Sequence, residues 1–306
     1  MTEPDPEFKN HGEKLKVLML VTEDWYFQSH RADLANTLMG TGFDIFVGAN
    51  INNLEAVTHN RSVRITHIPF RRGAGSMLHD IRTSLSVVNL IRRSKPDIVH
   101  SVAIKPIIIS LVSIFLFPRI KFVNAFSGMG YIFTSDSARS GAYFRLVRFL
   151  LRLIAKRRNC WALVQNTDDA EFLTSNKFSF PDRSRLIAGS GIKLRPEAAN
   201  NVGDNARRPL NIVLPARMLR DKGVEEFVEA AKHLASNNSC VFVLVGGVDP
   251  ENPASLTESE LKEFAARPNV QWWGKQKDMD AVYRQADIVC LPSYREGMPR
   301  TILESF

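Results

Sequence analysis

The stretch LNIVLPARMLRDKGVEEFVEAA, residues 210–231, is predicted to form a strand, a loop and a helix. Residues 210–216 are a short apolar run, typical of a strand that is buried on both faces of a sheet. Apolar residues then recur at helical spacing over 221–236: Val224, Phe227, Val228, Ala231 and Leu234. A strand followed by such a helix is the repeating unit of a parallel α/β sheet.

The same alternation extends in both directions along the chain. Downstream strands are predicted at 240–246, 269–274 and 287–292, with helices at 257–266 and from Asp278. Upstream strands are predicted at 16–21, 43–49, 63–68, 97–102, 121–126 and 161–166, with helices from about Ser29 and from Met77 to Ser94. We therefore predict an α/β protein with two doubly wound, Rossmann-like parallel-sheet domains. Ligands of such folds bind beyond the carboxyl ends of the strands, which here predicts a site in a cleft between facing domains.

The chain of 306 residues is long enough for two domains. Low hydrophobicity predicts a disordered tail at 1–14, and a polar, Asn-rich stretch without periodicity predicts a linker at 197–208. The two domains are then expected at 15–196 and 209–306.

The composition is that of an ordinary globular protein, with 44% hydrophobic and 24% charged residues. A net charge of +8 favours an anionic partner. The longest apolar run, 106–118, is too short to span a bilayer, so we expect a buried helix, with a shallow membrane contact as the alternative. The N-terminus lacks the pattern of a secretory signal, and an odd number of cysteines without a CxxC predicts reduced thiols: Cys160, Cys240 and Cys290. These features predict a cytoplasmic protein.

Several enzyme classes are disfavoured by missing motifs. In neither predicted domain is the first strand followed by GxGxxG, which counts against a dinucleotide oxidoreductase. The chain also contains no GxxxxGK[ST] motif, which counts against a P-loop nucleotidase, and no HExxH or GxSxG motif.

The loop after 210–216 carries Arg217 and Lys222, five positions apart, at the predicted start of a helix. Two cations close to helix N–H groups can clamp a diphosphate. The alternative is a solvated helix start with Asp221 as its N-cap.

The stretch REGMPRTILESF, residues 295–306, follows another predicted strand. Glu296 is expected in a loop, Pro299 in the first turn of a helix, and Glu304 inside that helix. Carboxylates accept hydrogen bonds from vicinal hydroxyls, so the two glutamates could contact opposite ends of a ligand that contains sugar or ribose.

Four segments together resemble one family. PSYREGMPRTILES (292–305) resembles the E-x7-E signature of retaining glycosyltransferases with the GT-B fold, in the family GT4, and PARMLRDKG (215–223) resembles its phosphate-binding loop. YFQSHRADLANTLMGTGFDI (26–45) and NAFSGMGYIFTS (124–135) are similar to a bacterial subset that builds lipopolysaccharide, capsule and exopolysaccharide. The similarity begins at about Lys16.

The resemblance implies a donor site in the second domain. Arg217 and Lys222 would hold the diphosphate of a nucleotide sugar, with UDP as the expectation from the family. Glu296 would contact the donor sugar, the amides of Gly297 and Met298 would approach sugar and phosphate, and Glu304 would bind the ribose. The acceptor, lipid-linked or saccharide, would bind on the side of the first domain, and transfer would retain the anomeric configuration without a cofactor.

In the first domain the resemblance is less complete. His100 matches the first of two family histidines, but the second position holds Val102; a histidine at a strand end without a ligand is the alternative. Lys105 matches a lysine of the bacterial subset, and His30, followed by Arg31, lies in a loop that favours a contact with acceptor or donor. Two loop glycines are expected to allow close approach of a ligand, with an ordinary turn as the alternative: Gly128 and Gly130.

Two further stretches carry charge. DMD at 278–280 resembles a metal-binding DxD, but Asp278 stands where an N-cap belongs, so we expect no metal ligand there. Residues 139–158 contain no acid and form a basic amphipathic pattern, which suits either an anionic membrane surface or a core helix with a solvated edge. Its basic stripe consists of Arg145, Arg148, Arg152 and Lys156.

Three other functions stay open. A sugar-nucleotide epimerase of similar architecture is one. A truncated, inactive relative that at most binds nucleotide is another, because family members continue beyond this last helix with a further strand and helix, which would make the second domain incomplete. A nucleic-acid-binding protein is disfavoured, because no recognised motif accompanies the charge.

Overall fold

The computed structural model describes residues 14–52, 63–71, 76–127, 141–192, 208–235, 239–250 and 252–306. The predicted tail, apart from Lys14, and the predicted linker, apart from Arg208, lie outside these residues. The chain divides into two compact units: unit 1 comprises Met1–Phe126, Arg145–Val164 and Ala170–Arg185, and unit 2 comprises Ser127–Phe144, Gln165–Asp169 and Leu186–Phe306.

Unit 1 is built on a seven-stranded sheet with the order β3-β2-β1-β4-β5-β6-β7. The strand pairs from β3 to β6 are parallel. The strands are β1 Lys16–Glu23, β2 Asp44–Asn50, β3 Arg64–His67, β4 Ile98–Val102, β5 Lys121–Phe126, β6 Cys160–Val164 and β7 Ser184–Leu186. The predicted strands of the first domain are thus confirmed, and β7 is an addition to them.

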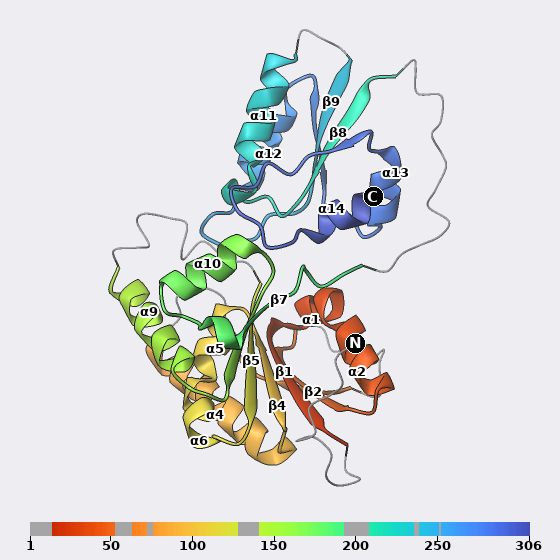
Figure 1. Ribbon diagram of the computed structural model, residues 1–306. Coiled ribbons are helices and arrows are strands. Elements are labelled where there is room, and N and C mark those ends of the chain that lie inside the picture. Colours follow the sequence, from red (N-terminus) through yellow and green to blue (C-terminus); the bar gives the residue numbers. More distant parts are fainter. Residues whose placement is uncertain are drawn as a thin grey trace. The chain divides into compact units, whose positions relative to one another are not determined.

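The sheet of unit 1 is covered on both faces (Figure 1). Val17, Met19 and Val21 of β1 pack in one cluster with Phe27 and Ala35, on the face that carries α1 and α2. The helices of the other face include α4, α5, α6 and α9. The helices are α1 Asp24–His30, α2 Ala32–Gly40, α4 Met77–Ser94, α5 Ile104–Ile109, α6 Leu111–Leu116, α9 Ala142–Ala155 and α10 Thr167–Ser175, and a 3-10 turn, η2, spans Pro181–Arg183.

Two predictions for unit 1 are wrong. The first helix begins at Asp24 rather than near Ser29, and the chain breaks at Arg31, whose φ of −132° and ψ of −11° interrupt the helical path. The predicted buried helix at 106–118 is two short helices that meet at Ser110. On the second of them, Phe115 and Leu116 are exposed rather than buried.

Unit 2 contains a four-stranded sheet with the order β10-β9-β8-β11, and every pair in it is parallel. The strands are β8 Leu210–Pro215, β9 Cys240–Val245, β10 Val270–Gly274 and β11 Ile288–Val289. The helical segments are η4 Arg220–Lys222, α11 Val224–His233, α12 Glu258–Ala265, α13 Met279–Gln285 and α14 Arg300–Ser305. The α/β architecture with two parallel sheets is as predicted.

The predicted helix face of unit 2 is confirmed at Val224, Phe227, Val228 and Ala231, whereas Leu234 follows the end of α11 and is exposed. Val224, Phe227 and Val228 of α11 pack in one cluster with Leu214 of β8 and Leu244 of β9. The opposite face of this sheet packs against Val282 of α13.

Three further predictions for unit 2 concern the ends of its helices and its last strand. The helix predicted from 221 is split, and the N-cap of α11 is Gly223 in the left-handed region, so Asp221 as N-cap is wrong. Asp278 does cap α13, because its carboxylate accepts a hydrogen bond from the N–H of Ala281. The strand predicted at 287–292 pairs only over Ile288–Val289.

Candidate functional site

The loops after β8 and β11 lie against each other at the carboxyl ends of neighbouring strands. The N–H of Tyr294 donates to the carbonyl of Asp221 over 3.1 Å. Gly223 has φ +71°, and a Cβ at this position would overlap the carbonyl oxygen of Pro292. Only glycine tolerates both conditions, so this close approach of the two loops depends on Gly223.

Each cation of the predicted diphosphate clamp has a carboxylate partner. Lys222 Nζ lies 2.6 Å from Glu296 Oε1, and the two side chains are 18% and 26% exposed. Arg217 Nη1 lies 2.6 Å from Asp249 Oδ2. Sequence reasoning missed Asp249, although its place just after β9 at the same edge of the sheet was a usable signal.

Glu304 lies in α14 and is held by neighbours on two helices. Arg300 Nη2 is 2.8 Å from Glu304 Oε1, and the Tyr283 hydroxyl is 3.4 Å from Oε2. Burial, and secondly the charge of Glu304, raise the pKa of Tyr283 to about 12, so this phenol stays protonated and can donate. Thr301 Oγ1 donates to Pro215 O over 3.3 Å, which fixes α14 at the end of β8.

The structure therefore places the predicted residues of the second domain on one edge of one sheet. Glu296 is in the loop and Glu304 in the helix, as expected, with Gly297 and Met298 in a bend between them. Cations and carboxylates are paired at this edge, and such groups can bind a ligand with both hydroxyl and phosphate groups.

In unit 1, His100 is buried in β4, with 7% of its surface exposed. Its Nδ1 lies 3.2 Å from the carbonyl oxygen of Val123, and because a carbonyl only accepts, Nδ1 carries the proton. Burial, and then the charge of Arg31, lower the pKa of His100 to about 4, so the ring is neutral at pH 7.

The other candidates of the first domain are separate side chains with partners of their own. Lys105 Nζ lies 2.7 Å from Asp80 Oδ2. His30, at the end of α1, stacks on Tyr26 with ring centroids 4.4 Å apart. Gly128 and Gly130 lie outside the described residues.

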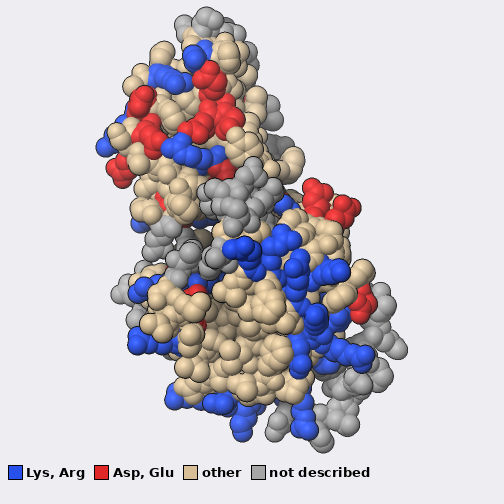
Figure 2. All heavy atoms as spheres, turned by 90° about the vertical axis from the view of Figure 1, so that its left-hand side faces the viewer, with Lys and Arg blue, Asp and Glu red and all other residues tan. Residues whose placement is uncertain are grey.

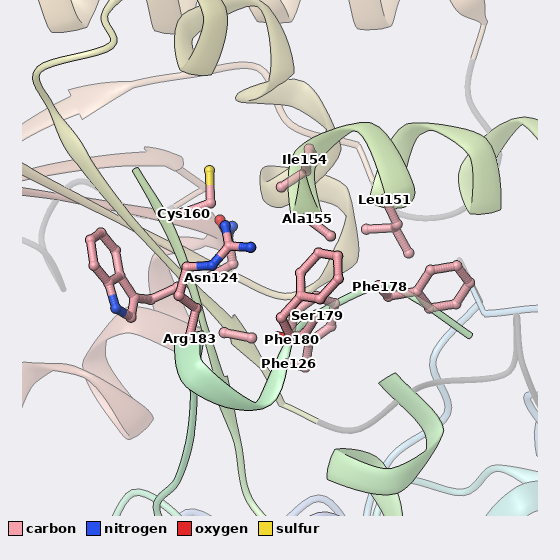
Figure 3. A pocket seen from close by; sticks show the side chains of 12 residues that line it. Asn124, Phe126, Leu151, Ile154, Ala155, Cys160, Phe178, Ser179, Phe180 and Arg183 are labelled. Atoms are coloured by element: carbon pink, nitrogen blue, oxygen red, sulfur yellow. The ribbon is translucent and has the colours of Figure 1, made fainter. Parts of the chain in front are cut away.

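A small cavity in unit 1 lies between α9 and strands β5 and β6, where Leu151, Ile154 and Cys160 line it (Figure 3). Its volume of about 10 Å³ suits a single water molecule rather than a sugar. Burial raises the pKa of the Cys160 thiol to about 12, which leaves it unreactive. The three cysteines are free.

Among the residues that the structure describes, no group of three or more His, Cys, Asp or Glu side chains could hold a metal ion. In the same residues, no helix is long and apolar enough to cross a bilayer.

Two family models match the chain in succession. Residues 16–159 match the model described as glycosyl transferase 4-like, and residues 209–306 match the model described as glycosyl transferases group 1. Each model matches less than half of the chain, so these matches are similarities of its two parts to glycosyltransferase models.

Curated relatives extend this result. The UDP-Gal:alpha-D-GlcNAc-diphosphoundecaprenol alpha-1,3-galactosyltransferase of Escherichia coli is 26% identical over 80% of this chain and 64% of its own length. The capsular polysaccharide biosynthesis glycosyltransferase CapM of Staphylococcus aureus is 24% identical over 78% of this chain and 63% of its own length. The N,N'-diacetylbacillosaminyl-diphospho-undecaprenol alpha-1,3-N-acetylgalactosaminyltransferase of Campylobacter jejuni is 38% identical over 32% of this chain and 24% of its own length. The chain therefore spans less than two thirds of each of these relatives.

Solved structures establish the fold as GT-B. Sucrose-phosphate synthase from Thermosynechococcus elongatus matches with a TM-score of 0.72 at 16% identity, over 95% of this chain and 79% of its own. Anabaena HepE, solved with UDP and glucose, matches with a TM-score of 0.69 at 15% identity, over 95% and 78%. A UDP-N-acetylglucosamine 2-epimerase also matches, with a TM-score of 0.58 at 13% identity, over 90% and 74%, so the fold alone does not separate transferases from epimerases.

Proposed function

We propose that this chain belongs to a retaining glycosyltransferase that moves a sugar from a UDP-sugar to a lipid-diphosphate acceptor in surface polysaccharide synthesis. The observation that carries the proposal is the edge of the unit 2 sheet, where Lys222 and Arg217 lie beside Glu296 and Asp249. The names of the relatives support both the reaction class and the lipid-linked acceptor.

In this proposal the donor diphosphate binds between Arg217 and Lys222. The phosphate oxygens add to, or replace, the carboxylates that these cations now contact. Glu296 then turns to the hydroxyls of the donor sugar, and Glu304 accepts from the ribose hydroxyls.

The transfer step needs charge stabilisation more than an acid or base. An acceptor hydroxyl forms the new bond to the anomeric carbon while the bond from that carbon to the phosphate oxygen breaks. Negative charge develops on the departing UDP, where the two cations stabilise it, and the hydroxyl proton leaves with that phosphate. Glu296 positions the sugar rather than acting as one of a hydrolase carboxylate pair.

Calorimetry with UDP and UDP-sugars tests the donor site. We expect Arg217→Ala to weaken UDP binding at least tenfold, a loss of about 1.4 kcal/mol, while Glu304→Gln weakens UDP more than inorganic pyrophosphate because only UDP has a ribose. Full affinity in both variants would refute the site. Release of UDP only when a polyprenyl-diphosphate sugar is added identifies a transferase, whereas conversion of a UDP-sugar without acceptor identifies an epimerase.

We also propose that unit 1 docks on an anionic membrane surface. Large apolar side chains are exposed on three helices: Met77, Leu78, Ile81 and Leu85 on α4, Val112, Phe115 and Leu116 on α6, and Leu146 and Phe149 on α9. The side of the molecule that bears these helices shows a largely uncharged area bordered by Lys and Arg (Figure 2). An apolar face with a basic border fits a leaflet of anionic lipid.

Helix α9 combines both alternatives considered for it. Phe144, Val147, Leu151 and Ile154 are buried, so the helix is part of the core. Its opposite side exposes Arg145, Arg152 and Lys156 beside Phe149, which is the pattern that contributes to docking. This surface would bring the enzyme to a lipid-linked acceptor at the cytoplasmic face of the membrane.

A further inference from the structure

Arg31 occupies the break between α1 and α2. Its backbone N–H donates to the carbonyl of Phe27 over 2.8 Å, which ends α1 and turns the chain. Only 6% of its surface is exposed, so the guanidinium lies inside unit 1. A charged group at this depth ordinarily has a counter-charge.

The described residues supply no such counter-charge. Arg31 takes part in none of their ion pairs; its Nη1 donates to the carbonyl of His30 over 2.9 Å, and its buried Nε has no hydrogen-bond partner. Asp33, two residues further along the chain, is exposed. Glu23 and Asp24, the next acids in sequence, accept hydrogen bonds from Asn52, which donates through its side chain to Glu23 Oε2 over 2.7 Å and through its backbone to Asp24 Oδ2 over 2.8 Å.

The neighbouring ionisable groups do not supply a negative charge for Arg31 either. His100 cannot be a counter-ion in either protonation state, because its imidazole is neutral or positive, and the charge of Arg31 disfavours its protonation. Tyr26 is the group whose charge interaction favours the guanidinium, but burial dominates and lowers the pKa of Arg31. A buried guanidinium kept without a carboxylate is expensive for folding, and such a cost is typical of a binding group rather than of a structural one.

We propose that Arg31 is an anion-binding residue of unit 1 that receives a phosphate group of the acceptor. A guanidinium binds phosphate through parallel N–H···O hydrogen bonds. The Nε–H of Arg31, which has no hydrogen-bond partner, can supply one of these donors. The choice of the acceptor phosphate rests on the proposed function, in which Arg217 and Lys222 bind the phosphates of the donor. Binding of an anion at Arg31 does not depend on that function.

The test uses inorganic pyrophosphate as the probe, because it resembles the lipid diphosphate without its tail. In the full chain with Arg217→Ala and Lys222→Ala, we expect calorimetry to detect pyrophosphate binding. Adding Arg31→Met should weaken it at least tenfold, while adding Arg31→Lys should retain part of it. Arg93→Met, at an exposed position near the end of α4, is the matched control and should change nothing.

Thermal unfolding distinguishes a binding role of Arg31 from a structural role. If Arg31 is a binding group, Arg31→Met should leave the midpoint of unit 1 unchanged or raise it, because a buried charge without a partner is removed. A clearly lower midpoint, or failure to fold, would make Arg31 structural and overturn the proposal, as would unchanged pyrophosphate binding in Arg31→Met.

A third measurement distinguishes the two sources of phosphate. UDP binding should persist in Arg31→Met in the otherwise unaltered chain; its loss would assign Arg31 to the donor and overturn the acceptor assignment. If instead the unaltered chain fails to bind UDP, the proposed function fails, while pyrophosphate binding that requires Arg31 would still stand.

Discussion

Lys222 Nζ lies 2.6 Å from Glu296 Oε1, and this ion pair joins the loops after β8 and β11 across 74 positions of sequence. The pair couples the residue expected to bind phosphate to the residue expected to bind sugar. A ligand that carries both groups would therefore act on both partners at once.

Replacement of Lys222 should weaken UDP binding, whereas replacement of Glu296 should not. Lys222→Met removes a phosphate contact, so we expect UDP affinity to fall roughly 10- to 100-fold, or about 1.4 to 3 kcal/mol. Glu296→Gln leaves Lys222 free for phosphate, so UDP affinity should be unchanged or higher. Calorimetry with UDP checks both.

The sugar contact is tested by comparing UDP with the preferred UDP-sugar. Glu296→Gln should abolish any preference for the UDP-sugar and lower the rate of transfer. Lys232→Met, on the exposed side of α11, is a control that should leave both ligands unaffected. Equal losses of UDP affinity in Lys222→Met and Glu296→Gln would contradict separate roles and indicate that the pair only supports the loop.

Gly223→Ala should strongly destabilise this edge of the sheet. The new Cβ would meet the carbonyl of Pro292 at a φ of +71°, so we expect a loss of about 2 kcal/mol or more in the stability of unit 2. Gly40→Ala is the matched control, because nothing lies within 4 Å of its Cβ position and it ends α2. It should be neutral or stabilise by about 0.5 kcal/mol. Urea unfolding, monitored by circular dichroism, measures the stability of both variants. Similar midpoints for Gly223→Ala and Gly40→Ala would contradict the predicted clash with Pro292.

The sequence predicted the parts of the fold that local pattern determines. Helix α4 at Met77–Ser94 and strand β5 at Lys121–Phe126 have the predicted bounds, because apolar periodicity and flanking breakers coincide there. The ends at Arg31 and Ser110 were missed, since neither glycine nor proline marks them and tertiary contacts decide the turn.

The candidate site also contains residues that the sequence predicts and residues that only the structure reveals. The loops of Arg217, Lys222, Glu296 and Glu304 could be found because their residues occur in recognisable segments. The partner Asp249 could not be paired with Arg217 from sequence, because an ion pair between two loops depends on how β8 and β9 align. The missing counter-charge of Arg31 is likewise visible only when burial is known.

Membrane docking can be tested by sedimentation with vesicles. The full chain should sediment with phosphatidylglycerol vesicles and much less with phosphatidylcholine vesicles. About 0.5 M salt should weaken the binding, because it screens the charges. Replacing Leu78, Ile81 and Phe149 by serine should reduce binding several-fold, since these side chains are exposed and contribute little to the core.

The charge contribution needs its own variant. Arg145→Gln with Lys156→Gln alters one exposed residue of α9 and the exposed residue that follows the helix, whereas Arg148 is avoided because it also donates to Asn176 over 2.6 Å. Binding that is unchanged in both the serine and the glutamine variants would exclude this face as the docking surface.

His100 should make the stability of unit 1 depend on pH. Its pKa is about 4 in the folded protein against 6.5 in the reference state, so the unfolded chain binds the extra proton between these values. Stability should therefore be constant above pH 6.5 and fall as the pH drops toward 4, by roughly 3 kcal/mol at most. Urea unfolding at several pH values measures this slope.

Two variants identify His100 as the source of that slope. His100→Asn keeps a donor for the carbonyl of Val123 but cannot titrate, so the fall between pH 6.5 and 4 should flatten. Arg31→Met removes the neighbouring charge, which is the second cause of the low pKa, so the fall should become shallower and its lower end should move to higher pH. An unchanged slope in His100→Asn would show that another group titrates, and an unchanged slope in Arg31→Met alone would show that burial accounts for the whole shift.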